Sequence, residues 1–226
     1  SNKSALLKES NKSRAKKIMQ KSNITTAEFF TTGPGEHKNK KAIPLMFPLF
    51  IKPITGGDSR GVDKNSIVHN YSSYKKKVLE IKKNQHSRCL VEKYLSGKEY
   101  SVGIFKDNIT GSVQAMPIEI IVKKNINGHH ILDFDIKKND EEKVIAVLNI
   151  KIFNQLSLLA KKSFTALKGK SFGRIDFKMD HLGNPHFMEA NLMPGIRKGY
   201  FYRSCILNLK INYEEMILKI TANGLH

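Results

Sequence analysis

Two short segments late in the chain set acidic, amide and guanidinium side chains among apolar residues. Residues 173–177 read Gly-Arg-Ile-Asp-Phe, and residues 187–191 read Phe-Met-Glu-Ala-Asn. Residues 180–184 between them are rich in turn formers, so the two segments are predicted to form a β-hairpin. Because side chains alternate along a strand, we expect the apolar ones to share the face that packs inward. These apolar residues are Ile175, Phe177, Met188 and Ala190.

The polar side chains of the hairpin then fall on its other face. Arg174 and Asp176 point one way, and Glu189 and Asn191 share a face in the second strand. If the two faces coincide, three oxygen ligands lie beside a guanidinium. Mg²⁺ prefers such ligands, and it usually carries phosphates. The pattern indicates a nucleotide-using enzyme, with a solvent-facing surface hairpin as the alternative.

A second segment with phosphate chemistry surrounds Lys52. This lysine ends a predicted strand over residues 47–52, directly before Pro53 and a glycine-rich loop at residues 54–62. The N–H groups of such a loop can approach phosphate oxygens closely, and the ammonium supplies countercharge. The loop lacks the order of a Walker motif, and many glycine-rich loops are only turns.

A charged connector follows a third apolar strand. Glu92-Lys93-Tyr94-Leu95 comes before Glu99. Backbone groups at Lys93 and Leu95 could read the edge of an adenine, and the Glu99 carboxylate could hold ribose hydroxyls. The alternative for this segment is an exposed connector.

Composition narrows the class of protein. The chain has 226 residues, 40% of them hydrophobic, which is enough for one large domain or two small ones. The net charge of +19 comes mainly from lysines scattered along the chain. Such charge fits nucleic acid, an anionic membrane or an anionic small molecule, or a solvated surface. There are few arginines to read bases and no nucleic-acid-binding motif, so nucleic acid is not the expected partner.

Cysteine content and hydropathy bear on location. Cys89 and Cys205 lie far apart without metal-ligand spacing, which suggests a reducing compartment. No apolar run is long enough to span a bilayer, and no signal peptide is visible. The cytoplasm is therefore the expected location, with no membrane partner.

The elements that must position these residues mix strands and helices, which favours an α+β class with mainly antiparallel sheets. Helices are expected over residues 11–23, 71–84, 143–167 and 213–221. Strands are expected over 47–52, 89–94, 100–105 and 111–122, besides the hairpin. Residues 125–140 and 193–204 are expected to be irregular.

The order of these motifs along the chain is more specific than any one of them. Lys12 in a basic helix precedes Lys52-Pro53, the connector, Arg174-Ile175-Asp176, and Glu189-Ala190-Asn191 with Pro194-Gly195. This set resembles the ATP-grasp superfamily, and within it the D-alanine–D-alanine ligases, from about residue 11 to the C-terminus. The resemblance implies an ATP-grasp fold, in which two α+β subdomains with mainly antiparallel sheets clasp ATP. Residues 1–93 would form the first subdomain, with the glycine-loop lid, and residues 94–226 the second.

The resemblance also implies roles for single residues. The nucleotide would be held by Lys12, Lys52, Ser59, Glu92, Lys93, Leu95 and Glu99. Two Mg²⁺ ions, for which Mn²⁺ could substitute, would be held by Asp176, Glu189 and Asn191. Arg174 and the Gly195 N–H would stabilise the tetrahedral intermediate, and Lys137 would reach the terminal phosphate.

The implied activity is that of an ATP-dependent ligase that forms an amide or peptide bond through an acyl phosphate. ATP and amino acids or small peptides would be its partners, and a homodimer is left open. A nucleotide-binding module without ligase activity of its own is the alternative.

Four departures from the family pattern bear on this activity. Asn11 stands in place of the usual aspartate, and Lys138 in place of an aromatic residue. The chain begins just where the N-terminal substrate domain of the family would end, so the resemblance implies that this domain is absent from it. The loop over residues 196–203 is bulkier and more basic than the family's acceptor loop. It indicates an acceptor other than D-alanine, unless the loop packs elsewhere.

Overall fold

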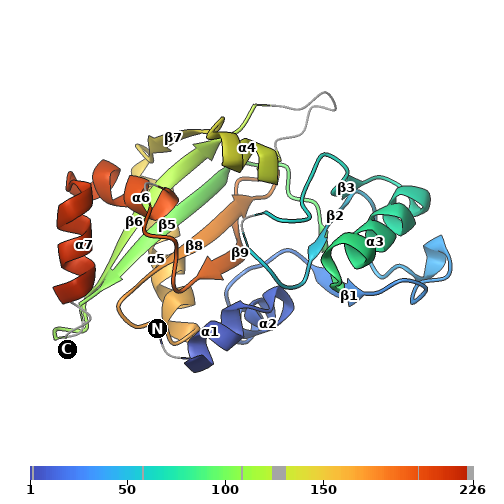
Figure 1. The fold of residues 1–226 in the computed structure, drawn as a ribbon, viewed down its shortest axis with the longest axis horizontal. Coiled ribbons are helices and arrows are strands. Elements are labelled where there is room, and N and C mark those ends of the chain that lie inside the picture. Colours follow the sequence, from blue (N-terminus) through green and yellow to red (C-terminus); the bar gives the residue numbers. More distant parts are fainter. Residues whose placement is uncertain (2, 58, 108, 124–130, 198, 223–226) are drawn as a thin grey trace.

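Two antiparallel sheets organise the fold (Figure 1). The computed structural model describes residues 1, 3–57, 59–107, 109–123, 131–197 and 199–222. Asp58 of the predicted glycine loop, Lys198 of the predicted acceptor loop and residues 125–130 lie outside the described residues.

The smaller sheet has four strands in the order β1-β4-β2-β3. They are β1 (Phe29–Thr32), β4 (Cys89–Lys93), β2 (Leu49–Pro53) and β3 (Ile67–Val68). Both β1 and β2 pair antiparallel with β4, so β4 is the central strand that carries the connector residues.

Helix α3 (Tyr71–Gln85) covers this sheet. Asn70 caps its start, because its side chain accepts from the N–H of Ser73 while the Ser73 hydroxyl accepts from the N–H of Asn70. Val78 and Ile81 then pack into one hydrophobic cluster with the strands. A lysine-rich helix is thus fixed by one apolar stripe.

The larger sheet has five strands in the order β7-β6-β5-β8-β9, all antiparallel. They are β7 (Lys143–Ala146), β6 (Val113–Ile121), β5 (Glu99–Lys106), β8 (Phe172–Met179) and β9 (Pro185–Asn191). The predicted hairpin is confirmed as β8 and β9.

Helices cover both faces of the larger sheet. Helix α5 (Ile150–Ala166) packs on one face, and α6 (Tyr200–Leu209) packs on the other, with α7 (Tyr213–Ala222) beside it. Gly103 of β5 allows α6 to approach closely, since a Cβ at this position would lie 2.8 Å from Cβ of Ser204.

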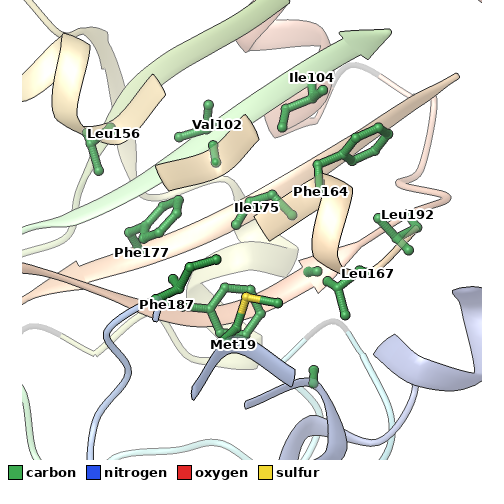
Figure 2. Close-up of a cluster of buried hydrophobic side chains, with 14 of the residues drawn as sticks. Met19, Val102, Ile104, Leu156, Phe164, Leu167, Ile175, Phe177, Phe187 and Leu192 are labelled. Carbon is green, nitrogen blue, oxygen red and sulfur yellow. The ribbon is translucent and has the colours of Figure 1, made fainter. Parts of the chain in front are cut away.

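The first two helices, α1 (Lys3–Glu9) and α2 (Lys12–Lys21), join the core of the larger sheet. Met19 lies in one cluster with residues of β8, β9 and α5, including Phe177, Phe187 and Phe164 (Figure 2). The division of the chain at residue 93 stays a prediction, and core contacts made by residues 5–24 cross it.

The strand pairing brings the two polar faces of the hairpin together. Arg174 lies opposite Asn191 and Asp176 lies opposite Glu189, while Ile175 packs into the core behind them. One expectation is wrong: Met188 does not pack inward. A bulge follows the Asp176–Glu189 pair, so that the Phe177–Phe187 pair comes next.

That bulge changes which side chains of β9 face the core. One extra residue in a strand reverses the alternation beyond it. Phe187 is therefore fully buried in the core, and Met188 lies half-buried along the cleft described below.

Three segments differ from their predicted structure. Residues 143–146 form strand β7 rather than the start of the long helix, which begins only at Ile150, where Asn149 caps it. Residues 134–139, expected to be irregular, form helix α4 (Phe134–Asn139), capped by Asp133. Residues 200–204, expected in a loop, belong to α6.

Three short elements were not predicted: α1, β1 and β3. A 3₁₀ turn (Lys40–Ala42) also lies between β1 and β2. Cys89 and Cys205 are buried free thiols. Among the described residues, no helix is long and apolar enough to cross a membrane.

Candidate active site

A cleft lies where the two sheets face each other, and most of the predicted site residues line it. It encloses about 970 Å³ of space, part of it open to solvent. The predicted residues on its wall come from both sheets, from α2 and α4, and from two loops. They are Lys12, Lys52, Ser59, Glu92, Lys93, Leu95, Glu99, Lys137, Asp176 and Glu189.

Lys12 lies at the first position of α2, where the helix meets the glycine-rich loop. Its N–H donates to the carbonyl of Ile54 at 3.0 Å, and its ammonium donates to the carbonyl of Gly56. Burial lowers the pKa of Lys12, and the neighbouring Lys52 also lowers it. The loop therefore lies against a helix N-terminus with a lysine at the same point, an arrangement suited to phosphate.

Ser59 ties the other side of the glycine-rich loop to the larger sheet's half of the cleft. Its hydroxyl donates to the carbonyl of Leu132 at 3.1 Å. Its backbone has φ of 55°, in the left-handed region. The loop thus reaches across the cleft toward the segment that leads into α4.

A buried ionic triad joins α2 to the smaller sheet. Glu92 forms ion pairs with Lys52, at 2.7 Å, and with Lys16. Burial by itself would raise the pKa of Glu92, but the two ammonium groups outweigh it and lower the pKa to about 2. Burial lowers the pKa of Lys16, whereas Lys52 has a raised pKa because the attraction of Glu92 and Glu189 exceeds its desolvation.

The connector residues also line the cleft. Glu99 accepts from the Lys178 ammonium at 3.1 Å, while Lys93 is exposed and lies 3.8 Å from Glu28. The N–H of Lys93 donates to the carbonyl of Glu28 at 2.9 Å. The Lys93 N–H and the Glu99 carboxylate thus already have partners within the protein.

The hairpin forms another strongly charged part of the cleft wall. Asp176 accepts from the Ser101 hydroxyl at 2.6 Å and receives two guanidinium nitrogens of Arg174, with distances of 3.0 Å from Nε and 2.9 Å from Nη2. Burial would raise the pKa of Glu189, but Lys12, Lys137 and Lys52 together lower it. Glu189 is therefore an ionised carboxylate among cations. The Glu189 carboxylate has no hydrogen bond or ion pair within the described part of the chain.

Three of the predicted site residues are not among the residues that line the cleft. Arg174 and Asn191 lie opposite each other in the hairpin, just beyond it. Gly195 is exposed in the loop after β9, with open space around the position of a Cβ. Their roles stay predictions, as do those of the residues on the wall.

Several residues of the cleft wall were not predicted as site residues, among them Lys16, Lys178, Tyr200 and Met188. Lys16 could have been found, because it follows Lys12 by four residues on the same helix face. Lys178 shares a face with Asp176. Tyr200 and Met188 had no sequence signal, since one depends on the start of α6 and the other on a bulge.

The described residues contain no cluster of three or more His, Cys, Asp or Glu placed to hold a metal ion. The set predicted for metal has two carboxylates and one amide, all of them oxygen donors that suit Mg²⁺. The ionised Glu189, lacking a protein partner within the residues described, fits such an ion. Asp176 would have to share its oxygens with Arg174.

The chain is similar to a known family along most of its length. Residues 18–222 match the family model described as D-ala D-ala ligase C-terminus. The chain is 28% identical over 213 residues to the D-alanine–D-alanine ligase of Flavobacterium psychrophilum, covering 92% of this chain and 61% of that protein. It is 27% identical over 181 residues to that of Buchnera aphidicola, covering 80% of this chain and 56% of the relative. The chain thus spans less than two thirds of these relatives' length.

A solved structure shares the fold. The crystal structure of D-alanine–D-alanine ligase from Bacillus anthracis complexed with ATP matches with a TM-score of 0.78 and 23% sequence identity. The match covers 100% of this chain and 69% of that one. The predicted α+β, ATP-grasp fold is confirmed.

Proposed function

The chain belongs to the family of D-alanine–D-alanine ligase C-terminal domains, and from this premise we propose that it is an ATP-dependent carboxylate–amine ligase. The reaction would form an amide or peptide bond through an acyl phosphate. Curated relatives carry the name D-alanine–D-alanine ligase, which supports amino acids as substrates.

One observation carries the proposal. The pairing of Asp176 with Glu189 across the hairpin sets two carboxylates at the end of a cleft where three lysines converge. Lys12, Lys52 and Lys137 line the same cleft as Glu189, and their positive charges lower the pKa of its carboxyl. A cation-rich site with oxygen ligands suits a triphosphate with its metal.

The nucleotide would lie along the cleft. Its base would lie by the connector, with Glu92, Lys93 and Leu95 at the base and Glu99 at the ribose. Its phosphates would lie by Lys12, Lys52 and Ser59. Magnesium, held by Asp176, Glu189 and Asn191, would supply charge neutralisation when bound.

The chemistry follows from these positions. An oxygen of the substrate carboxylate attacks the γ-phosphorus of ATP, the bond to the β-phosphate oxygen breaks, and ADP leaves. The lone pair of the amine then attacks the acyl carbon, and inorganic phosphate leaves as the amine loses a proton. Lys137 would neutralise charge on the transferring phosphoryl group. Arg174 and the Gly195 N–H would face the tetrahedral oxyanion, where one donor typically contributes about 3–4 kcal/mol.

The acceptor is proposed to differ from D-alanine. The loop before α6 carries the exposed, basic Arg197 and leads into the bulky Tyr200, whereas Phe201 and Tyr202 pack in a hydrophobic cluster of the larger sheet. Tyr200 lines the cleft and so limits the space beside the hairpin.

We also propose the cytoplasm as the location, in keeping with two buried free thiols.

The test is release of ADP and phosphate from ATP and Mg²⁺ with a panel of D- and L-amino acids and dipeptides. We expect the wild-type protein to turn over at least one pair of substrates. In Glu189→Gln this turnover should fall by about 100-fold or more, which is the size of effect expected when one electrostatic group is removed. Glu119→Gln is the matched control, since Glu119 is a carboxylate of the same sheet away from the cleft wall and paired with Lys98 at 2.8 Å.

Two results would count against the proposal. Unchanged turnover in Glu189→Gln would refute the metal assignment. Tight binding of Mg-ATP without turnover on any substrate would instead indicate a nucleotide-binding module.

A further inference from the structure

One aromatic ring lies beside two of the cations at the reacting end of the cleft. The ring of Tyr200, at the start of α6, lies 5.7 Å from the Lys137 ammonium and 5.4 Å from the Arg174 guanidinium carbon. Both distances fall within the range of cation–π attraction. Lys137 comes from α4 and Arg174 from β8, so a third element brings the two together.

The ring is itself held from behind. The Tyr200 hydroxyl donates to Oε1 of Glu142 at 2.8 Å, and both side chains are buried. Burial raises the pKa of Tyr200, and the Glu142 carboxylate raises it further, so the phenol stays protonated and keeps donating. Such a hydrogen bond to a charged acceptor in a buried place fixes the ring's orientation.

Arg203, one turn further along α6, secures the same acidic segment. Its guanidinium pairs with Asp140, at the end of α4, and lies 3.5 Å from Glu142. Oε2 of Glu142 has no hydrogen-bond partner among the described residues. Glu142 is thus committed to the two α6 side chains rather than to the cleft.

Apolar contacts add to these polar ones. Ile136 of α4 packs against the cluster that contains Tyr200, Leu132 and Ile118. Helix α4 is short, and it carries the lysine predicted to reach the terminal phosphate. A lysine on a flexible stem loses side-chain entropy when it is held in place, so a fixed ring beside it lowers the cost of that ordering during the reaction.

We propose that Tyr200 is a positioning residue that holds the Lys137 ammonium and the Arg174 guanidinium at the reacting end of the cleft, with Glu142 and Arg203 fixing its ring. The proposal rests on the proposed ligase function for its effect on rate. Its effect on the position of α4 is independent of that function.

The kinetic test compares Tyr200→Leu and Tyr200→Phe with Tyr202→Leu. Tyr202 is the control, because it lies on the same helix but packs against Tyr213, with ring centroids 5.7 Å apart. Tyr200→Leu should lower kcat for ADP release by about 10-fold, while the Kd for a non-hydrolysable ATP analogue stays within about twofold. Tyr200→Phe keeps the ring but loses the hydrogen bond to Glu142, so its kcat should lie between those of Tyr200→Leu and the wild type.

A second measurement does not need turnover. Hydrogen–deuterium exchange of peptides covering residues 134–142 should be faster in Tyr200→Leu than in the wild type and unchanged in Tyr202→Leu. Thermal unfolding of each variant shows whether it is folded.

The outcomes separate the two proposals. A wild-type kcat in Tyr200→Leu, an equal loss of kcat in Tyr202→Leu, or a matching loss of nucleotide affinity would overturn the positioning role. If the wild-type protein itself turns over no substrate, the ligase proposal fails, and exchange alone decides. Unchanged exchange at residues 134–142 in Tyr200→Leu would then overturn the inference.

Discussion

The buried carboxylate of Glu92 offers the sharpest test of how helix α2 and the smaller sheet are held together. Glu92→Gln keeps the shape of the side chain but removes the charge that faces Lys16 and Lys52. The native fold lowers the pKa of Glu92 from 4.5 to about 2. At 1.36 kcal/mol per pKa unit, this difference of about 2.5 corresponds to roughly 3.4 kcal/mol of stability at neutral pH. It agrees with the roughly 3–5 kcal/mol lost when one partner of a buried ion pair is removed.

The pH dependence follows from the sign of that change. Because the pKa is lowered in the folded state, the stabilisation is complete above about pH 4.5 and is lost as the pH falls toward 2. Urea unfolding followed by circular dichroism should therefore show a large gap between wild type and Glu92→Gln at pH 7. The gap should narrow by pH 3.

The control is Glu36→Gln, which removes an ion pair to Arg88 whose side chains are 41% and 52% exposed. Exposed pairs contribute about 0–1 kcal/mol, so this variant should change little. A loss below about 1 kcal/mol in Glu92→Gln, or a gap that stays constant from pH 7 to pH 3, would refute the reasoning.

Other predictions concern Glu9, a glycine and a core phenylalanine. Burial raises the pKa of Glu9 from 4.5 to about 7, so without nucleotide or metal the wild-type free energy of unfolding should fall as pH rises across that window. Glu9→Gln should flatten this slope in urea titrations, and an unchanged slope would contradict the assignment. Gly97→Ala should destabilise by about 1–3 kcal/mol in thermal unfolding, since its Cβ would lie 2.6 Å from the carbonyl oxygen of Asp180. Phe164→Ala should cost about 3–5 kcal/mol because its side chain is fully buried, and Leu158→Ala, at a position that is 54% exposed, should cost far less.

The residues that were predicted well are those whose signal is local. Period-two alternation was enough to place Arg174 with Asp176 on one face of β8 and Glu189 with Asn191 on one face of β9, and the strand pairing brings these two faces together. Helix α2 and strand β2 were also recognisable, since each is bounded by a marked residue, Asn11 at one and Pro53 at the other.

The residues that were missed depend on contacts far apart in sequence. Residues 143–146 read as the start of a helix, but Val144 and Ile145 pair with β6, and tertiary pairing overrode the local pattern. The role of Tyr200 depends on where α6 begins, and Met188 faces the cleft only because β9 bulges. Neither event has a signal in the residues themselves.

The paired strands β1 and β4 have a consequence for dissecting the protein. The chain enters and leaves the smaller sheet at one place, since Phe29 lies opposite Glu92 and the N–H of Lys93 bonds to the carbonyl of Glu28. A turn of two or three residues could therefore replace the whole segment from the start of β1 to the end of β4. Within the described residues, the hydrophobic clusters of the two sheets share no member, so the excision would leave the larger core whole.

Such a shortened chain would separate residues proposed to bind the nucleotide from residues proposed to act in the reaction. It would retain Arg174, Asp176 and Glu189 but lose Lys52 and the carboxylate that neutralises Lys16. Lys16→Met would be needed to spare α2 an unpaired buried charge. The hairpin could then be studied in this shortened chain, with different nucleotide-binding domains fused to it.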